Sequence, residues 1–265
     1  MQSFNYVKPA SVAEAAAALS GADDGTVMAG GQTLLPTMKA RLAAPSDVVD
    51  LGGIAELKGI SVGGGNVTIG AMTRHADVAN SGDVQGAIPA LAALAGGIGD
   101  QAVRNRGTMG GSVANNDPAA DYPAAVLALD ATVTTNSRSI AADDFFNGLF
   151  ETALNEGEIV TSISFPVPEK AAYVKFPNPA SRYAMVGVFV AKTAGGVRVA
   201  VTGAGDGGVF RVAAYESALA ANFSASAIAD GVVPASGLNS DLHADAEYRA
   251  HLIGVMTRRA VAACG

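Results

Sequence analysis

The sequence predicts an α+β protein with two domains. Of its 265 residues, 49% are hydrophobic and only 15% are charged, which is enough apolar material for an extensive core. Strand and helix patterns are mixed without regular β-α-β alternation, which argues against a single parallel sheet wrapped in helices. The segment Pro166-Val167-Pro168 ends a strand pattern, so we expect domains at 1–168 and 169–265.

Short helices and strands are expected in the N-terminal part. Ser11-Val12-Ala13-Glu14 has the pattern of a capping box, in which the serine accepts from an early helix N–H and the glutamate reaches back, and it predicts a helix that ends near Leu19. The next expected elements are a strand at 26–29, a short helix within 32–42, a strand at 47–51, and a hairpin of 60–62 with 67–69.

Helices and strands are also expected in the middle and C-terminal parts of the chain. Helices are expected at 74–79, 90–95 and 118–129, and strands at 131–135 and 158–165. Beyond residue 168, three strands with hairpin spacing are expected at 172–176, 185–192 and 197–202, with helices at 212–221 and 244–263. One face of the last helix carries Tyr248, Leu252, Val255 and Met256, and its arginines Arg249, Arg258 and Arg259 should point mostly elsewhere.

Composition excludes several classes of function. The net charge of −7 repels nucleic acid and anionic lipid. A single cysteine, Cys264, cannot form an intrachain disulfide or hold zinc or an iron–sulfur cluster, and the three histidines make no metal-binding pattern. The longest uncharged apolar stretch, 86–99, has 14 residues, fewer than the roughly 20 of a membrane span, and the N-terminus has no signal-peptide pattern. A cytoplasmic protein without a transmembrane segment or metal site is expected.

Two glycine pairs are the strongest candidates for a ligand site. They lie in Ala29-Gly30-Gly31-Gln32-Thr33 and Thr108-Met109-Gly110-Gly111-Ser112, and each pair is followed by a hydroxyl side chain. Without Cβ atoms, paired glycines let backbone N–H groups converge on an anion. Alone, either pair is more often a turn. Two such loops facing one another would hold a diphosphate without lysine, and a carboxylate in the following segment 117–121 could accept from ribose hydroxyls.

Other motifs have structural explanations. Gly63-Gly64-Gly65-Asn66 lies between two short alternating strands and predicts a hairpin turn. The run 203–208 matches G-x-G-x-x-G, but the residues after it look extended instead of opening a helix, so it is not expected to bind a nucleotide. His75 and His251 are expected to be solvated or locally hydrogen-bonded. The basic segment 104–106 either holds its own loop by arginine hydrogen bonds or contacts a ligand phosphate.

At the glycine pairs the sequence resembles a known family. The segment 29–36 resembles the first FAD-diphosphate loop, and 98–121 the second, of the medium flavoprotein subunit of molybdenum hydroxylases. The segments 48–51 and 69–75 resemble the stretches between those loops. The resemblance spans nearly the whole chain. Within the xanthine dehydrogenase family, the sequence most resembles the medium subunits of the aerobic carbon monoxide dehydrogenase type.

The resemblance implies a fold and a set of FAD-binding residues. The fold is of the vanillyl-alcohol-oxidase (PCMH) type, with two subdomains split near residue 57 and a C-terminal domain of a three-stranded antiparallel sheet and helices. By position, Asp121 would bind the ribose or adenosine part, Val160 would supply a backbone contact and Tyr183 would lie against the isoalloxazine. Gln32 stands where some relatives have histidine. The full implied set is Ala29, Gly30, Gly31, Gln32, Thr33, Leu34, Thr108, Gly110, Gly111, Ser112, Asn115, Asp121, Val160, Lys175 and Tyr183.

The resemblance also implies partners and a function without a catalytic side chain. Electrons from a molybdopterin large subunit would pass through [2Fe-2S] clusters of a small subunit to FAD, and then to a quinone or another acceptor. The expected assembly is a dimer of heterotrimers. Carbon monoxide, purines, aldehydes and N-heterocycles all stay open as substrates. Two alternatives also stay open: a self-sufficient FAD-dependent oxidase or dehydrogenase, and a non-catalytic nucleotide-binding module.

Overall fold

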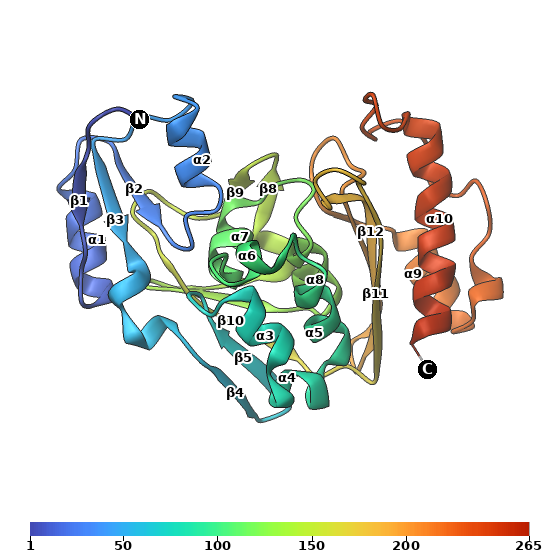
Figure 1. Cartoon of the computed structure of the whole chain (residues 1–265). Coiled ribbons are helices and arrows are strands. Elements are labelled where there is room, and N and C mark those ends of the chain that lie inside the picture. Colours follow the sequence, from blue (N-terminus) through green and yellow to red (C-terminus); the bar gives the residue numbers. More distant parts are fainter. Residues whose placement is uncertain (265) are drawn as a thin grey trace.

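The structure, a computed structural model, describes residues 1–264. Figure 1 shows three larger sheets from left to right, with helices between the central sheet and the last one and on the outer sides of the first and the last. Both helices and strands alternate irregularly along the chain. The predicted α+β class is therefore confirmed.

The N-terminal sheet is parallel and has the order β1 (Asn5–Val7), β3 (Asp47–Asp50), β2 (Gly25–Met28). Helix α1 (Val12–Ser20) packs on it and begins as the capping box predicted, because the Ser11 side chain accepts from the N–H of Glu14 at 3.2 Å. Helix α2 (Leu34–Lys39) follows the first glycine pair, and the 3-10 turns η1 (Leu51–Gly53) and η2 (Ala55–Leu57) lead to the next sheet.

The central sheet is antiparallel, with the order β4 (Ile60–Gly63), β5 (Asn66–Gly70), β10 (Val160–Pro166), β6 (Thr132–Thr135), β7 (Ser139–Ala141). The 3-10 turn η3 (Ala142–Asp144) leads to a small hairpin of β8 (Phe146–Gly148) and β9 (Glu151–Thr152). The β4–β5 hairpin turns at Gly64 and Gly65, whose φ angles are +59° and +78°, as predicted for this glycine run.

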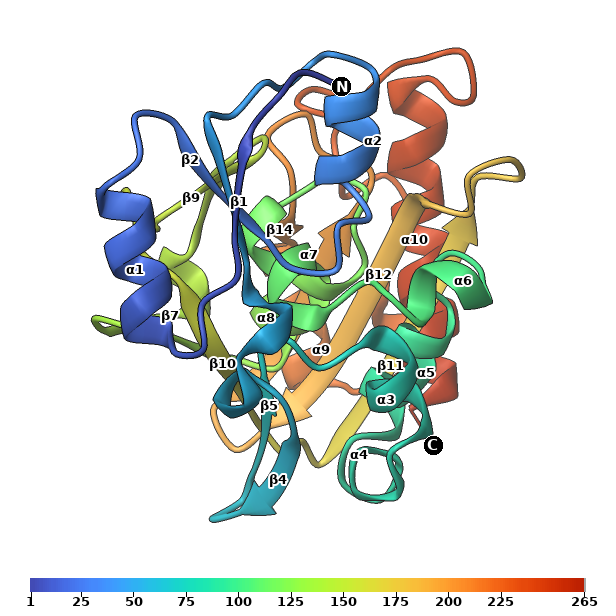
Figure 2. The same cartoon turned by 60° about the vertical axis from the view of Figure 1, so that its left-hand side comes forward.

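Six helices connect β5 to β6. They are α3 (His75–Asn80), α4 (Gly82–Ala87), α5 (Pro89–Gly96), α6 (Gln101–Arg104), α7 (Met109–Asn115) and α8 (Tyr122–Ala128). Every residue of α8 is buried, because this helix is apolar on all sides and contacts strands of the C-terminal sheet on one side and α5 and α7 on others. Figures 1 and 2 both show α2 above α7, so the helix that follows the first glycine pair lies near the helix that contains the second.

The C-terminal sheet is antiparallel, with the order β11 (Lys170–Pro177), β12 (Ala184–Thr193), β13 (Gly196–Thr202), β14 (Phe210–Arg211). The expected three strands are present, and a fourth joins them because Phe210 and Arg211 pair with β13. Alternation along β12 divides two cores: Phe189 packs in the central core, while Val188 and Val190 pack in the core under α9 (Ala213–Ala221) and α10 (Ala246–Ala263). The turn η4 (Ala225–Ala227) joins these two helices.

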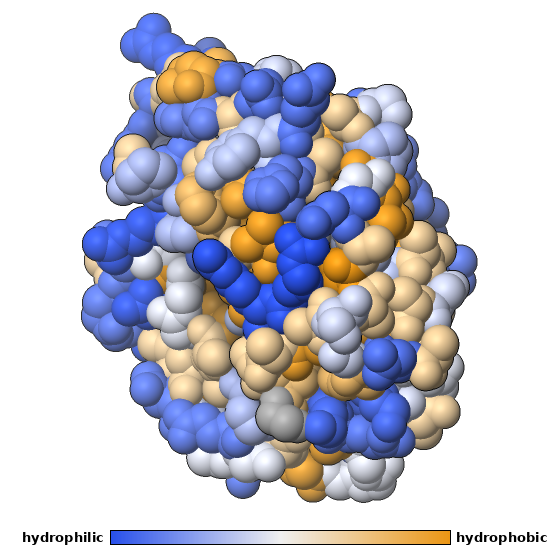
Figure 3. Space-filling model, turned by 90° about the vertical axis from the view of Figure 1, so that its right-hand side faces the viewer, coloured by the Kyte–Doolittle hydropathy of each residue, from blue (hydrophilic) through white to orange (hydrophobic). Residues whose placement is uncertain are grey.

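Helix α10 corrects one expectation. Arg249 was expected away from the apolar face, but it is 3% exposed and donates to the carbonyl oxygens of Met185 and Gly203, at 2.7 and 3.1 Å, and to the Asp241 carboxylate. These acceptors lie at the ends of strands and in a loop, so the helical periodicity of the sequence could not predict that Arg249 would bond to them. Figure 3 shows the face of the molecule on which this helix lies, where hydrophilic side chains are interspersed with small apolar patches.

The glycine-rich run after β13 begins no helix. Residues 203–208 connect β13 to the short strand β14 and open no helix, as predicted. Among the described residues, no helix combines the length and apolar character needed to cross a bilayer. The domain boundary at 168, which falls between β10 and β11, and the split near 57 stay predictions.

Candidate functional site

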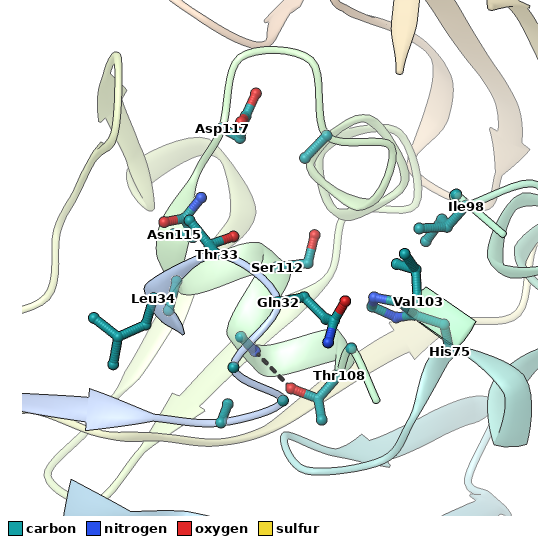
Figure 4. A pocket seen from close by; sticks show the side chains of 18 of the residues that line it. Gln32, Thr33, Leu34, His75, Ile98, Val103, Thr108, Ser112, Asn115 and Asp117 are labelled. Atoms are coloured by element: carbon teal, nitrogen blue, oxygen red, sulfur yellow. Dashed lines mark hydrogen bonds between the residues drawn. The ribbon is translucent and has the colours of Figure 1, made fainter. Parts of the chain in front are cut away.

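A cavity of about 440 Å³ lies where three parts of the chain meet. The loop before α2 forms one wall, α6, α7 and the segments beside them form the second, and the loop between β11 and β12 adds the third. Its size is within the range of small-molecule sites. Figure 4 shows side chains from the first two walls pointing into the same space.

The first glycine pair presents unbonded backbone N–H groups. Gly31 has φ +72°, a left-handed conformation that turns the chain sharply before α2. Within residues 1–264, the N–H groups of residues 30 to 34 have no acceptor, and the Thr33 hydroxyl does not cap the helix. Backbone donors without a partner favour an anion, and a helix start adds partial positive charge. This loop therefore suits the diphosphate of a nucleotide.

The two segments that carry the glycine pairs pack directly against each other. A Cβ on Gly30 would lie 2.1 Å from the carbonyl oxygen of Arg106, and a Cβ on Gly111 would lie 3.1 Å from the Ala29 Cβ. Only glycine allows these approaches, because a side chain at Gly30 would overlap backbone. The sequence prediction that the two motifs meet at a common cavity is confirmed.

The second glycine pair corrects the prediction of a turn with free amides. It lies in the first turn of α7, where Thr108 caps the helix and its hydroxyl accepts from the N–H of Gly111 at 3.2 Å, the dashed contact in Figure 4. The N–H groups of Gly110 and Ser112 donate to carbonyls of Ala71 and Thr108. This pair therefore contributes close approach and the Ser112 hydroxyl, which has no intrachain partner among the described residues, instead of amides.

Most residues of the implied set line this one cavity. Those on its wall are Ala29, Gly30, Gly31, Gln32, Thr33, Leu34, Thr108, Gly111, Ser112, Asn115, Asp121 and Tyr183.

Three residues of the implied set do not line the cavity. Gly110 packs against Ala71, where a Cβ would approach to 2.4 Å, and Val160 is a core residue of β10 with 4% exposure. Lys175 lies behind Asp121 and donates to it and to the carbonyl oxygen of Gly97. None of these three residues forms part of the wall.

Asp121 joins the cavity wall to the C-terminal sheet. Its carboxylate is buried, accepts from the Tyr173 hydroxyl and forms an ion pair with Lys175 at 3.0 Å. Burial raises the pKa of Asp121, and the Lys175 charge opposes that shift. Both partners belong to β11, so the acid that the resemblance assigns to the ribose also links two parts of the fold.

His75 is a cavity residue that the sequence analysis missed. It was expected to be solvated or locally hydrogen-bonded, but it is 5% exposed and has no side-chain partner within residues 1–264. Burial, followed by the nearby Arg104 charge, lowers its pKa to about 4. The sequence did offer one indication that His75 is part of the site, because it ends the segment 69–75, which resembles the family.

Arg104 holds its own loop by hydrogen bonds, which was one of the two interpretations of the basic segment 104–106. Its guanidinium donates to the carbonyl oxygens of Ile98 and Gly99, at 2.9 and 3.0 Å. These bonds hold the loop before α6, which supplies Ile98 and Val103 to the cavity wall. Arg104 itself is not part of that wall.

Comparison with known proteins decides the family. Residues 2–168 match the family model described as the FAD binding domain in molybdopterin dehydrogenase. The chain belongs to this family. It is 36% identical over 279 residues to the nicotine 6-hydroxylase medium subunit of Paenarthrobacter nicotinovorans, covering 100% of this chain and 98% of the relative. To the carbon monoxide dehydrogenase medium chain of Hydrogenophaga pseudoflava it is 35% identical over 274 residues, covering 97% and 96%.

Solved structures agree with these relatives. Carbon monoxide dehydrogenase from Hydrogenophaga pseudoflava, in a form lacking the Mo-pyranopterin moiety, matches with a TM-score of 0.92 at 36% identity, covering 99% of this chain and 97% of that chain. Quinoline 2-oxidoreductase from Pseudomonas putida 86 matches with a TM-score of 0.89 at 30% identity, covering 99% and 97%. The family resemblance of the glycine motifs is thus confirmed.

The residues on the cavity wall fit FAD, the cofactor in the family's name. Unbonded amides from residues 30 to 34 and the Thr33 and Ser112 hydroxyls suit a diphosphate, and glycines at 30 and 111 let the two segments that present these groups pack closely together. Among residues 1–264 the cavity wall has no lysine and one arginine, Arg182, so neutral donors would carry most of this recognition beside that single cation. The chain is an FAD-binding oxidoreductase subunit of the molybdenum hydroxylase family.

Proposed function

We propose that this chain passes electrons from the iron–sulfur clusters of a partner subunit through bound FAD to a quinone or another acceptor. The observation that carries the proposal is the row of unbonded amides at residues 30 to 34, which faces Ser112 across the cavity. Bound FAD supplies the redox chemistry, since a flavin accepts electrons singly and releases two. The chain's own task is to bind and orient the cofactor.

Different residues on the wall suit different parts of FAD. The amides of residues 30 to 34 and the Thr33 and Ser112 hydroxyls would hold the diphosphate. Tyr183 is 48% exposed and still lines the cavity, so its ring offers a flat surface for the isoalloxazine close to the outside of the protein. An isoalloxazine in that place would be accessible to electrons from another subunit. No side chain needs to act as an acid or base.

The expected partners are an iron–sulfur small subunit and a molybdopterin large subunit, in a dimer of heterotrimers in the cytoplasm. Support comes from the relatives, which are described as a medium subunit, a medium chain and a subunit of a dehydrogenase complex. Their names specify nicotine, carbon monoxide and 6-hydroxypseudooxynicotine as different substrates. The substrate would accordingly be selected by the large subunit.

Absorbance spectroscopy of the purified chain with FAD tests this function. We expect a yellow protein that bleaches with dithionite but not with carbon monoxide, a purine, an aldehyde or an N-heterocycle until the partner subunits are added. Bleaching by one of these substrates without partners would instead support a self-sufficient dehydrogenase. A chain that binds ADP but no FAD would support a nucleotide-binding module.

A variant pair connects the spectroscopy to the cavity. Ser112→Ala removes a cavity hydroxyl, and one lost hydrogen bond to a charged group should weaken FAD binding about tenfold. Ser61→Ala removes an exposed hydroxyl on β4, away from the cavity, and should leave the affinity unchanged. Equal affinities in the two variants would count against diphosphate binding at Ser112.

A further inference from the structure

The turn of the β8–β9 hairpin exposes two large apolar side chains. Gly148 pairs with Glu151, so Leu149 and Phe150 form a two-residue turn between the strands. Leu149 is 50% exposed and Phe150 is 60% exposed. Exposure of large apolar side chains to water is unfavourable, and neighbouring ones mark surfaces that bind another molecule. We call these two residues the hairpin tip.

Phe150 is also held in an unfavourable backbone conformation. Its φ is +53°, and of the five non-glycine residues with a positive φ within residues 1–264 it is the only hydrophobic one. Turns normally place glycine or asparagine at such positions, because a bulky side chain is strained there. A large aromatic residue at a position that is both strained and exposed indicates a function for its ring.

Asn116 fixes the hairpin tip from below. Its Nδ2 donates to the carbonyl oxygens of Gly148 and Glu151 at 2.8 and 2.9 Å, and its own carbonyl oxygen accepts from the N–H of Phe150 at 3.2 Å. Asn116 is 1% exposed, so these bonds are shielded from water. The hairpin tip is therefore a rigid surface, which loses little conformational entropy when a partner binds.

These contacts place the hairpin tip beside the opening of the cavity. Asp117, the residue after Asn116, lines the cavity, and so does Tyr183. The two side chains are close together, since the Asp117 charge adds to the effect of burial in raising the pKa of Tyr183. Both are partly exposed, so they lie where the cavity meets the surface. Figures 1 and 2 both show the turn of this hairpin beside α2, the helix that follows the first glycine pair.

The charges around the hairpin tip are acidic. Asp117 and Glu151 are next to it in the chain, and Asp206 belongs to a loop beside it, where a Cβ on Gly208 would lie 3.7 Å from the carbonyl oxygen of Gly148. The carboxylates of Glu151 and Asp206 are exposed and have no partner among the described residues. No lysine or arginine occurs in the stretches of chain that carry these acids, which are 115–118, 146–152 and 203–208. Such a border attracts a basic surface and sets its orientation.

We propose that the hairpin tip and its acidic border are the docking site of the iron–sulfur subunit, which would present an apolar depression bordered by lysine or arginine side chains. This inference rests on the proposed function for the identity of the partner. An electron donor has to approach the flavin where the cavity opens, and the hairpin tip stands beside that opening. Leu149 and Phe150 are not on the cavity wall, so FAD binding does not need them.

Partner binding by a Phe150→Gly variant tests the proposal. Calorimetry of the FAD-loaded full chain with the purified iron–sulfur subunit should show an affinity about thirtyfold below that of the wild type, as expected for loss of a central aromatic contact. FAD affinity should be unchanged. The variant should melt at the same or a higher temperature, because glycine relieves the strain at a positive φ. A residue with only a structural role would lower the melting temperature and leave partner affinity unchanged.

Val62→Ser is the matched control. Val62 is 49% exposed on β4 of another hairpin, at the opposite end of the molecule in Figure 1. It should bind the iron–sulfur subunit as the wild type does. Equal partner affinities of Phe150→Gly and Val62→Ser would overturn the docking site and leave the proposed electron transfer standing.

Two further variants separate the apolar contact from the charges. Leu149→Ser removes the other apolar side chain, at a position without a positive φ, and should weaken partner binding about tenfold. Asp206→Lys should slow association and reduce its dependence on salt, because rim charges act mainly on the association rate. Association of the wild type that does not depend on salt would contradict the acidic border.

Two results with the wild type would overturn the proposal. If the FAD-loaded chain takes no electrons from the reduced iron–sulfur subunit, the proposed function fails and the docking site with it. If the chain alone forms a dimer in sedimentation experiments, and Phe150→Gly abolishes it, the hairpin tip contacts a second copy of this chain instead.

Discussion

The carbonyl oxygen of Arg106 lies against Gly30 so closely that a Cβ on Gly30 would approach it to 2.1 Å. This contact joins the loop before α2 to the segment before α7, two regions far apart in the sequence. It aligns the unbonded amides of residues 30 to 34 with the hydroxyl of Ser112 in one cavity. Its removal should therefore affect both stability and cofactor binding.

Gly30→Ala should reduce FAD affinity at least thirtyfold and lower the free energy of unfolding by about 1–3 kcal/mol, because the methyl group pushes two backbone segments apart. FAD titration and urea denaturation measure the two effects. Gly86→Ala on α4 is the control, since nothing lies within 4 Å of its added Cβ and alanine favours a helix. Similar behaviour of the two variants would contradict the contact.

Asn116→Ala should destabilise the protein by about 3 kcal/mol. Asn116 is 1% exposed, has φ +44°, and donates through Nδ2 to the carbonyl oxygens of Gly148 and Glu151, at 2.8 and 2.9 Å. Alanine removes both of these hydrogen bonds and is strained at a positive φ. Urea denaturation should show the loss, and Asn147→Ala, at an exposed position on β8, should cost less than about 0.5 kcal/mol.

Lys175→Met should destabilise the protein by about 3 kcal/mol at pH 8, because it leaves the buried Asp121 carboxylate without its cation. Burial already raises the pKa of Asp121, and losing Lys175 raises it further. An acid with a raised folded-state pKa destabilises the fold as pH rises above its unfolded pKa, so the deficit should be smaller at pH 5 than at pH 8. Lys192→Met, whose partner Glu169 is exposed, should show little loss at either pH. A pH-independent deficit in Lys175→Met would rule out this explanation.

His75 should make stability depend on pH between 6.5 and 4. Its pKa is lowered to about 4 in the folded protein, so the unfolded chain takes up a proton in this range that the folded chain does not. Stability from this group is present above pH 6.5 and lost as pH falls toward 4, by about 3 kcal/mol in total. The difference between wild type and His75→Leu in denaturation experiments isolates this effect from the carboxylates. A constant difference from pH 7 to pH 4 would show that His75 is not kept neutral by burial.

Local patterns predicted most elements because their causes are local. The Ser11 cap, the turn at Gly64 and Gly65 and the hairpin spacing of β12 and β13 each involve residues within a few positions of one another. The second glycine pair was misread for the same reason. Glycine disfavours helices in general, and only bonds to Ala71 and Thr108 explain why it begins α7.

The amino-acid sequence alone determined the α+β class, the two glycine motifs and the family to which they belong. Tertiary structure decided which groups on those motifs are free to bind: the amides at residues 30 to 34 are unbonded, whereas those at Gly110 and Gly111 already have partners. It also decided that His75 and Arg249 are buried. The physical reason is that burial and hydrogen-bond satisfaction depend on atoms from distant segments, and no short-range periodicity records them.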